Sequence, residues 1–87
     1  MSGYHTREIR KGYLGESSKI QEELDELMDA EDQQNKILML CELSDIYGAM
    51  DMYLHKYFEG LTMYDVALMA KATKQAFESG ERRSEED

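Results

Sequence analysis

Proline and tryptophan are absent from this sequence of 87 residues, and cysteine occurs once, at Cys41. A single cysteine cannot close a disulfide within the chain, which excludes a domain held together by internal disulfides. Cys41 lies in an apolar run, so we expect a small buried thiol in a reducing compartment. Without proline, and with six glycines that largely separate helical patterns, the chain is predicted to be all-helical.

Basic residues are also scarce, because 10 Lys and Arg face 19 Asp and Glu and leave a formal net charge of -9. Nucleic-acid binding draws on clustered Lys and Arg, so we expect no nucleic-acid partner held by a general basic field. The charge balance instead favours carboxylates that bind a cation.

A membrane-spanning or secreted chain is not expected either. Residues 2–11 are polar and charged, without the apolar core that a secretory signal needs. Residues 37–54 approach membrane-spanning length, but Glu42, Asp45 and Asp51 would each be costly near a bilayer centre. We therefore expect a soluble, cytoplasmic protein with no membrane partner.

The length allows one domain, and three helical patterns follow one another along it. They cover residues 17 or 18 to between 30 and 33, about 35–58, and 63 to about 79. The predicted organisation is an N-terminal arm or short helix at 1–16, a helical domain at 17–80 and an acidic, flexible tail at 81–87.

Local signals predict where two of these helices begin. Ser18 is followed three residues later by Gln21, and Thr62 by Asp65, which are the spacings of capping boxes. Gly80 is expected to stop the third helix.

The second pattern is unusually apolar, since 13 of the 18 residues at 37–54 are apolar and none is basic. Such a helix must be covered on most sides, and a chain this short has only a thin core of its own. The third pattern is expected to turn inward Met63, Val66, Ala67, Ala70 and Phe77. The predicted fold is all-α, an antiparallel helical hairpin plus a third helix that completes a four-helix-bundle core by oligomerisation.

Acidic residues are concentrated at 22–32, where seven of eleven residues are Asp or Glu. Helical rotation puts Glu23 and Glu26 on one flank of an apolar stripe, whereas Asp25 and Asp29 are expected to point away. The spacing of Glu23 and Glu26 brings their Cβ atoms within about 5 to 6 Å. A run of this kind standing alone would be read as a solvated helix face.

Glu42 and Asp45 repeat the same spacing on the second helix, inside an apolar sector. An ionised carboxylate taken out of water needs a basic partner, a raised pKa or a metal. The helix offers no Lys or Arg between Lys36 and Lys56.

Antiparallel packing of the two helices would bring both acidic pairs together as four hard oxygen donors. This donor set suits Mg²⁺, with Mn²⁺ as a substitute, and such an ion completes its coordination with phosphates of a substrate. The alternative is that the acids pair with lysines of the assembled bundle: Lys19, Lys36, Lys71 or Lys74.

The remaining polar residues give weaker signals. His5 and His55 have no Cys or His nearby at metal-ligand spacing, so we expect surface or core-edge positions for both. Lys71 and Lys74, with Arg82 beyond them, are solubilising surface residues by themselves, but opposite a metal-bound phosphate they would become clamps.

Two segments together resemble a known family, the all-α MazG-like nucleotide pyrophosphohydrolases, which share their fold with dimeric dUTPases and phosphoribosyl-ATP pyrophosphohydrolases. The sequences KIQEELDEL at residues 19–27 and ELSDI at residues 42–46 are similar to the family's EExxE and ExxD motifs, in the same order.

The resemblance implies Mg²⁺ ligands at Glu23, Glu26, Glu42 and Asp45. It also implies catalytic acids at Glu22 and Glu23, with Glu22 orienting water or a second ion, and phosphate-binding residues at Lys71, Lys74 and Arg82. The implied reaction is hydrolysis of a nucleoside triphosphate to the monophosphate and pyrophosphate, for house-cleaning or control of the nucleotide pool, by a homodimer or homotetramer.

Other functions stay open at this point. The chain could be a non-catalytic acidic helical adaptor or a DNA mimic, although a mimic should spread its acids over the outer surface. Within the same fold, the substrate could instead be dUTP, dCTP or a phosphoribosyl nucleotide such as phosphoribosyl-ATP.

Overall fold

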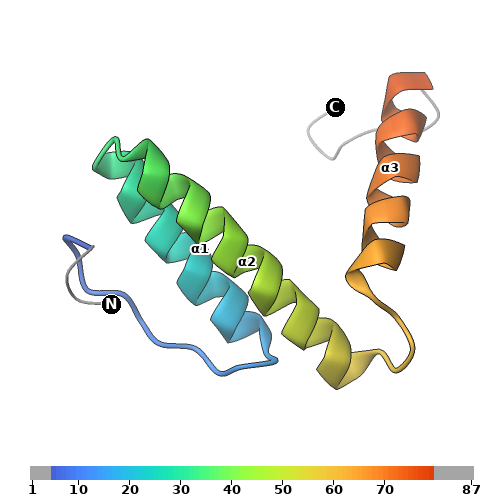
Figure 1. The fold of residues 1–87 in the computed structure, drawn as a ribbon, viewed down its shortest axis with the longest axis horizontal. Helices are drawn as coiled ribbons and strands as arrows, with labels where there is room; N and C mark the ends of the chain where they lie inside the picture. The colour runs from blue at the N-terminus through green and yellow to red at the C-terminus, as the bar shows by residue number, and fades with distance from the viewer. Residues whose placement is uncertain (1–4, 80–87) are drawn as a thin grey trace.

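Residues 5–79, the part of the chain that the computed structural model describes, contain three α-helices and no strand (Figure 1). They are α1 (Ser17–Asp32), α2 (Lys36–Tyr57) and α3 (Met63–Ser79), so the all-helical prediction and the three predicted ranges are confirmed. Gly80, Arg82 and the predicted tail at 81–87 lie outside the described residues.

The start of α1 differs from its predicted cap. The N-cap residue is Glu16, which makes no capping bond with its side chain. The hydroxyl of Ser18 instead accepts the backbone N–H of Tyr13 at 3.0 Å, and the amide of Gln21 donates to Asp25 at 2.9 Å. The predicted capping box at Ser18 is therefore wrong, because the preceding segment uses the hydroxyl that the helix would need.

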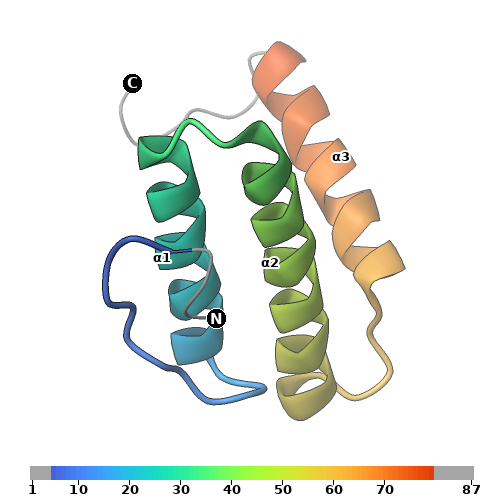
Figure 2. The ribbon, with the colours of Figure 1, turned by 60° about the vertical axis from the view of Figure 1, so that its left-hand side comes forward.

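A tight turn joins α1 to α2. Gln34 has a φ of +57°, and around it the N–H of Asn35 bonds the carbonyl of Ala30 at 3.1 Å, the pattern of a Schellman motif. The side chain of Asn35 then caps α2 by accepting the N–H of Leu38 at 3.0 Å. This turn reverses the chain, so α1 and α2 lie side by side and antiparallel (Figure 2).

The apolar interior of the hairpin is small. Its fully covered apolar side chains, together with the first residue of α3, are Ala30, Leu38, Ala49, Leu54 and Met63. Acidic residues fill much of the remaining space between the helices, as described below. The thin core expected from the length is therefore observed.

The third helix begins at a cap that the sequence predicted. The N–H of Thr62 donates to the carboxylate of Asp65 at 2.8 Å, and Gly60 just before it adopts a φ of +87°. From there α3 contacts α2 but not α1, and it leans away from the hairpin (Figure 1). Met63 is its only buried residue.

Other residues predicted to face inward from α3 do not do so. Val66 is half-buried, whereas Ala67, Ala70 and Phe77 are exposed. The prediction assumed that α3 packs along its length against the hairpin, and within one chain it does not.

Large apolar side chains of α2 and α3 are exposed as well. Ile37 is 79% exposed, Leu40 69% and Met69 66%. Cys41 is also exposed, so the prediction of a buried thiol is wrong: the apolar run around it faces outward in the single chain. Despite this apolar content, no helix within residues 5–79 has the length and hydropathy needed to cross a membrane.

The cap of α2 gives a direct test of this arrangement. We expect Asn35→Ala to lower the free energy of unfolding by about 1 kcal/mol, because the N–H of Leu38 loses its acceptor. Urea denaturation at one fixed protein concentration measures the change. Asn35→Ser should retain most of the stability, and an equal loss in both variants would contradict the capping role.

Candidate metal centre

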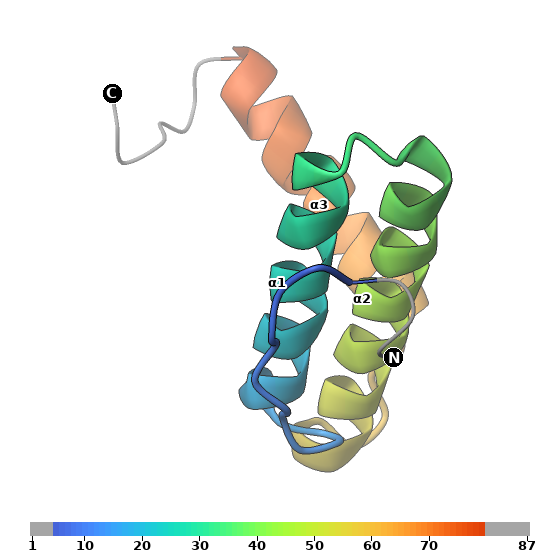
Figure 3. The ribbon, with the colours of Figure 1, turned by 90° about the vertical axis from the view of Figure 1, so that its left-hand side faces the viewer.

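An arm without helix, residues 5–16, crosses the hairpin on the side opposite to α3 (Figure 3). Its route is fixed by two acidic residues of α1 that are buried beneath it, Glu22 and Asp29. The arm therefore covers the acidic face of α1, while most of the apolar surface of α2 and α3 stays open.

Asp29 is the first anchor, and its side chain is completely buried. Its carboxylate accepts the hydroxyl of Thr6 at 2.7 Å, the N–H of Thr6 at 3.0 Å and the side-chain amide of Gln33 at 2.9 Å. The Nε of Arg7 lies 3.3 Å away. The hydrogen bond from the Thr6 hydroxyl lowers the pKa of Asp29 most, and burial alone would raise it. The bonds from His5, the Thr6 N–H and Gln33 add to the lowering, so the pKa of Asp29 lies well below its usual value. The prediction that Asp29 points away is wrong, because the arm folds over that face.

Glu22 is the second anchor. Burial by itself would raise its pKa, but the N–H of Gly12 at 2.8 Å and the ammonium of Lys19 at 3.2 Å outweigh burial and lower it. Gly12 is needed at this point of the arm, since a Cβ there would overlap the backbone of Ser18. Oε1 of Glu22 thus holds the arm through Gly12, and Oε2 pairs with Lys19 of α1 and lies 3.7 Å from Lys11 of the arm.

The four predicted ligands come from both helices of the hairpin and meet in overlapping groups. Ligand atoms of Glu23, Glu42 and Asp45 lie within 4.8 Å of one another, and Glu26 is grouped in the same way with Glu22 and Glu23. Glu23, Glu26 and Glu42 are buried, whereas Asp45 is exposed. Antiparallel packing therefore brings the two acidic pairs together.

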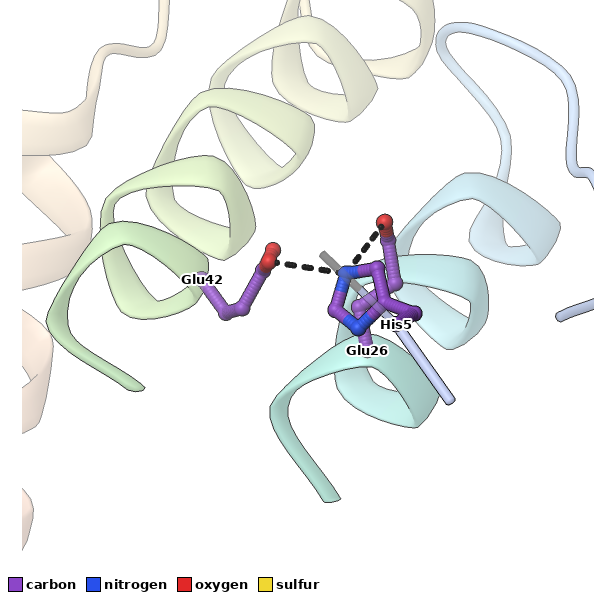
Figure 4. A group of neighbouring side chains, drawn as sticks. All are labelled: His5, Glu26 and Glu42. Carbon is purple, nitrogen blue, oxygen red and sulfur yellow. Dashed lines mark hydrogen bonds and ion pairs between the residues drawn. The ribbon is translucent and has the colours of Figure 1, made fainter. Parts of the chain in front are cut away.

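His5 lies at the centre of this cluster, which the sequence did not indicate. Its Nε2 is 3.1 Å from Glu42 and 3.2 Å from Glu26, between α1 and α2 (Figure 4), and its Nδ1 is 2.8 Å from Asp29. The ring is only 5% exposed, so the prediction of a surface or core-edge position is wrong for His5. It holds for His55, which is exposed.

Few basic side chains lie near the buried acids of the cluster. The ammonium of Lys19 lies 3.2 Å from Glu22 and 3.5 Å from Glu23. The alternative of neutralisation by lysines thus applies in part to these two residues. Among the described residues, Glu26 and Glu42 meet no lysine or arginine and have only His5 as a basic neighbour.

Within residues 5–79, two buried carboxylate oxygens, Oε2 of Glu23 and Oε1 of Glu42, have no hydrogen-bond partner. Burial, with the charge of Glu26 next, raises the pKa of Glu23 to about 7 and also raises that of Glu42. A divalent cation would supply both the missing partner and the missing charge. The donor set is mainly hard oxygen, so the residues present fit Mg²⁺ or Mn²⁺.

The predicted phosphate clamps are elsewhere. Lys71 and Lys74 are exposed on α3, on the far side of the hairpin from the arm (Figures 1 and 3). Neither makes an ion pair within residues 5–79, and Arg82 is outside them. One chain alone does not bring these lysines to the acids.

A hollow of about 500 Å³ opens at the acidic cluster. It is lined by the polar residues His5, Glu26, Glu42 and Asp45 and, on the first turns of α2, by Ile37, Leu38 and Cys41. A second hollow of about 470 Å³ follows the arm past Arg7 and Lys11 to Glu26. Arg7 and Lys11 offer positive charge in the second hollow, and Ile37 and Leu38 offer apolar surface in the first.

Comparison of the chain with protein-family models, with curated proteins and with solved structures gave no match.

The raised pKa of Glu23 predicts a pH dependence of the metal-free protein. Because its pKa is about 7 when folded and near 4.5 when unfolded, the folded state holds the extra proton between these values, and stability falls as the pH rises through this range. The raised pKa of Glu42 acts in the same direction. Asp29 and Glu22 have lowered pKa values, so their contribution to the stability of the protein is lost only at more acidic pH.

When the pH rises from 5 to 8, we expect the free energy of unfolding of wild type to fall by about 1 to 3 kcal/mol more than that of Glu23→Gln. Urea unfolding in the presence of EDTA at both pH values measures this difference. Glu31→Gln, at an exposed position of the same helix, is the matched control and should follow wild type. A slope unchanged in Glu23→Gln would show that the carboxyl titrates normally.

Proposed function

We propose that this protein binds Mg²⁺, with Mn²⁺ as a substitute, between α1 and α2 and hydrolyses nucleoside triphosphates to the monophosphate and pyrophosphate. One observation carries the proposal: carboxylates from both helices converge in a sheltered site where Oε2 of Glu23 and Oε1 of Glu42 have no hydrogen-bond partner among the described residues. The KIQEELDEL and ELSDI motifs, which resemble those of MazG-like pyrophosphohydrolases, supply the same residues.

The residues that would hold the ion are Glu23, Glu26, Glu42 and Asp45. Three of them are buried and one is exposed, so the site has both a dry base and an open side toward the hollow. A bound divalent ion lowers the pKa of water and neutralises the charge of a polyphosphate.

The chain's own groups would place the substrate around this site. The apolar wall of the hollow at Ile37 and Leu38 suits a nucleobase or sugar, and Arg7 and Lys11 on the arm suit phosphates. Glu23 would also be a candidate to accept a proton from attacking water, through the oxygen that does not hold the ion. Glu22, the other catalytic candidate, would act from beside it while it fixes the arm through Gly12.

Lys71, Lys74 and Arg82 remain candidate phosphate clamps only if a second copy presents them. We propose a homodimer or homotetramer in which apolar surfaces of α2 and α3 pack against a partner, completing a four-helix core. The exposure of Leu40 and Met69 supports this, since these side chains have little cover within one chain.

The competing function is a non-catalytic acidic adaptor or DNA mimic. Such a protein needs its charges on the outside, where a partner reads them. Here five acidic residues, Glu22, Glu23, Glu26, Asp29 and Glu42, are buried. This burial favours a cation site over a mimic. The choice among nucleoside triphosphates, dUTP, dCTP and phosphoribosyl nucleotides belongs to the substrate screen below.

Glu42→Gln tests the site. With millimolar Mg²⁺ and a panel of nucleotides, wild type should release pyrophosphate, and Glu42→Gln should lose at least about a hundredfold in rate because a charged ligand is gone. Mg²⁺ should also raise the melting temperature of wild type far more than that of Glu42→Gln. Glu31→Gln is the matched control. Equal thermal shifts in all three proteins, with no pyrophosphate, would favour the adaptor.

Leu40→Glu tests the assembly. Because Leu40 is 69% exposed on the apolar face of α2, we expect a charge there to convert the oligomer into a 10.1 kDa monomer in sedimentation experiments. Ser17→Glu adds the same charge at the exposed start of α1 and should leave the assembly intact. A wild type that sediments as a monomer at micromolar concentration would refute the proposed oligomer.

A further inference from the structure

The ring of His5 is held in one orientation by Asp29. Oδ2 of Asp29 also accepts the N–H of Thr6 at 3.0 Å, so it is an acceptor, and Nδ1 of His5 at 2.8 Å must carry the hydrogen. Nε2 is then directed away from Asp29, toward Glu26 and Glu42. A carboxylate that orients a histidine through its other nitrogen is the usual support of a metal-binding imidazole.

The spacing around Nε2 is that of neighbouring ligands on one ion. Nε2 lies 3.2 Å from Oε1 of Glu26 and 3.1 Å from Oε2 of Glu42 (Figure 4). Ligands bound at about 2.1 Å in adjacent octahedral or tetrahedral positions are roughly 3.0 to 3.4 Å apart. No side chain would have to move far for these three atoms to share a cation.

A second observation points to a missing ligand at the same place. Glu42 has a side chain only 5% exposed, and its Oε1 has no hydrogen-bond partner. Glu42 and His5 both line the hollow at the cluster. One carboxylate therefore carries both the unsatisfied Oε1 and the Oε2 that lies against Nε2 of His5.

We propose that Nε2 of His5 is a ligand of the divalent cation, together with Glu26 and Glu42, and that the site binds Mn²⁺ more tightly than Mg²⁺. This inference rests on the proposed cation site and adds a nitrogen donor from the arm to it. An imidazole raises affinity for transition-metal ions, whereas Mg²⁺ gains little from exchanging oxygen for nitrogen. The arm then forms part of the centre and couples its own position to metal binding.

The competing reading is that His5 fills the site as an imidazolium and excludes the metal. The two readings predict opposite effects of removing the ring. If His5 is a ligand, its removal weakens Mn²⁺ binding. If the imidazolium of His5 competes with the metal, its removal strengthens the binding of both Mn²⁺ and Mg²⁺.

Titration calorimetry with Mn²⁺ and with Mg²⁺ separates the readings. We expect His5→Gln to weaken Mn²⁺ binding at least about tenfold and to change Mg²⁺ binding by less than about threefold. His55→Gln, which removes an exposed histidine from α2, is the matched control and should bind both ions as wild type does. Tighter binding of both ions by His5→Gln, or no change, would overturn the inference.

Electron paramagnetic resonance of Mn²⁺-loaded wild type adds a measurement that does not depend on a variant folding. Spin-echo modulation should reveal one directly bound imidazole nitrogen in wild type and in His55→Gln, and none in His5→Gln. If wild type binds Mn²⁺ without nitrogen modulation and Glu42→Gln abolishes binding, the cation site stands and the role of His5 is refuted. If wild type binds neither ion, the proposed function fails as well.

Discussion

The mutual repulsion of carboxylates buried between the two helices and beneath the arm is the constraint on which the rest of this structure depends. Glu22, Glu23, Glu26, Asp29 and Glu42 are all withdrawn from water. An ionised carboxylate in such a place is tolerated only with hydrogen-bond donors or positive charge nearby. Two of the five, Asp29 and Glu22, receive these from the arm and from Lys19. The others keep an excess of negative charge, which the raised pKa values of Glu23 and Glu42 express.

This arrangement accounts for the uneven distribution of apolar residues. Acidic side chains fill much of the contact between α1 and α2, so few apolar ones are left to form a core there. The apolar faces of α2 and α3 are consequently turned outward, where a second copy would cover them in the proposed assembly. In the proposed assembly the acidic face of the hairpin binds a cation, and its apolar face packs against a second copy of the chain.

The arm contacts both the anchoring acids and the candidate cation site. It contributes no helix, yet it supplies Gly12 to Glu22 and Thr6 to Asp29, and it inserts His5 among the remaining acids. A segment that donates hydrogen bonds to the anchoring acids, and also presents Arg7 and Lys11 along a hollow, is a natural part of a site for a charged ligand. The proposed pyrophosphohydrolase activity and the proposed imidazole ligand both depend on the arm keeping this position.

Sequence periodicity by itself determined the three helices, the cap at Thr62 and the meeting of Glu23 with Glu42 and Asp45, because helical spacing and a short turn fix these locally. Tertiary structure alone decided the roles of His5 and Asp29. Their contact spans 24 residues, and that between His5 and Glu42 spans 37, so no local pattern records either. The exposure of Phe77 was likewise set by where α3 lies, since apolar periodicity says which side of a helix seeks cover but not which surface provides it.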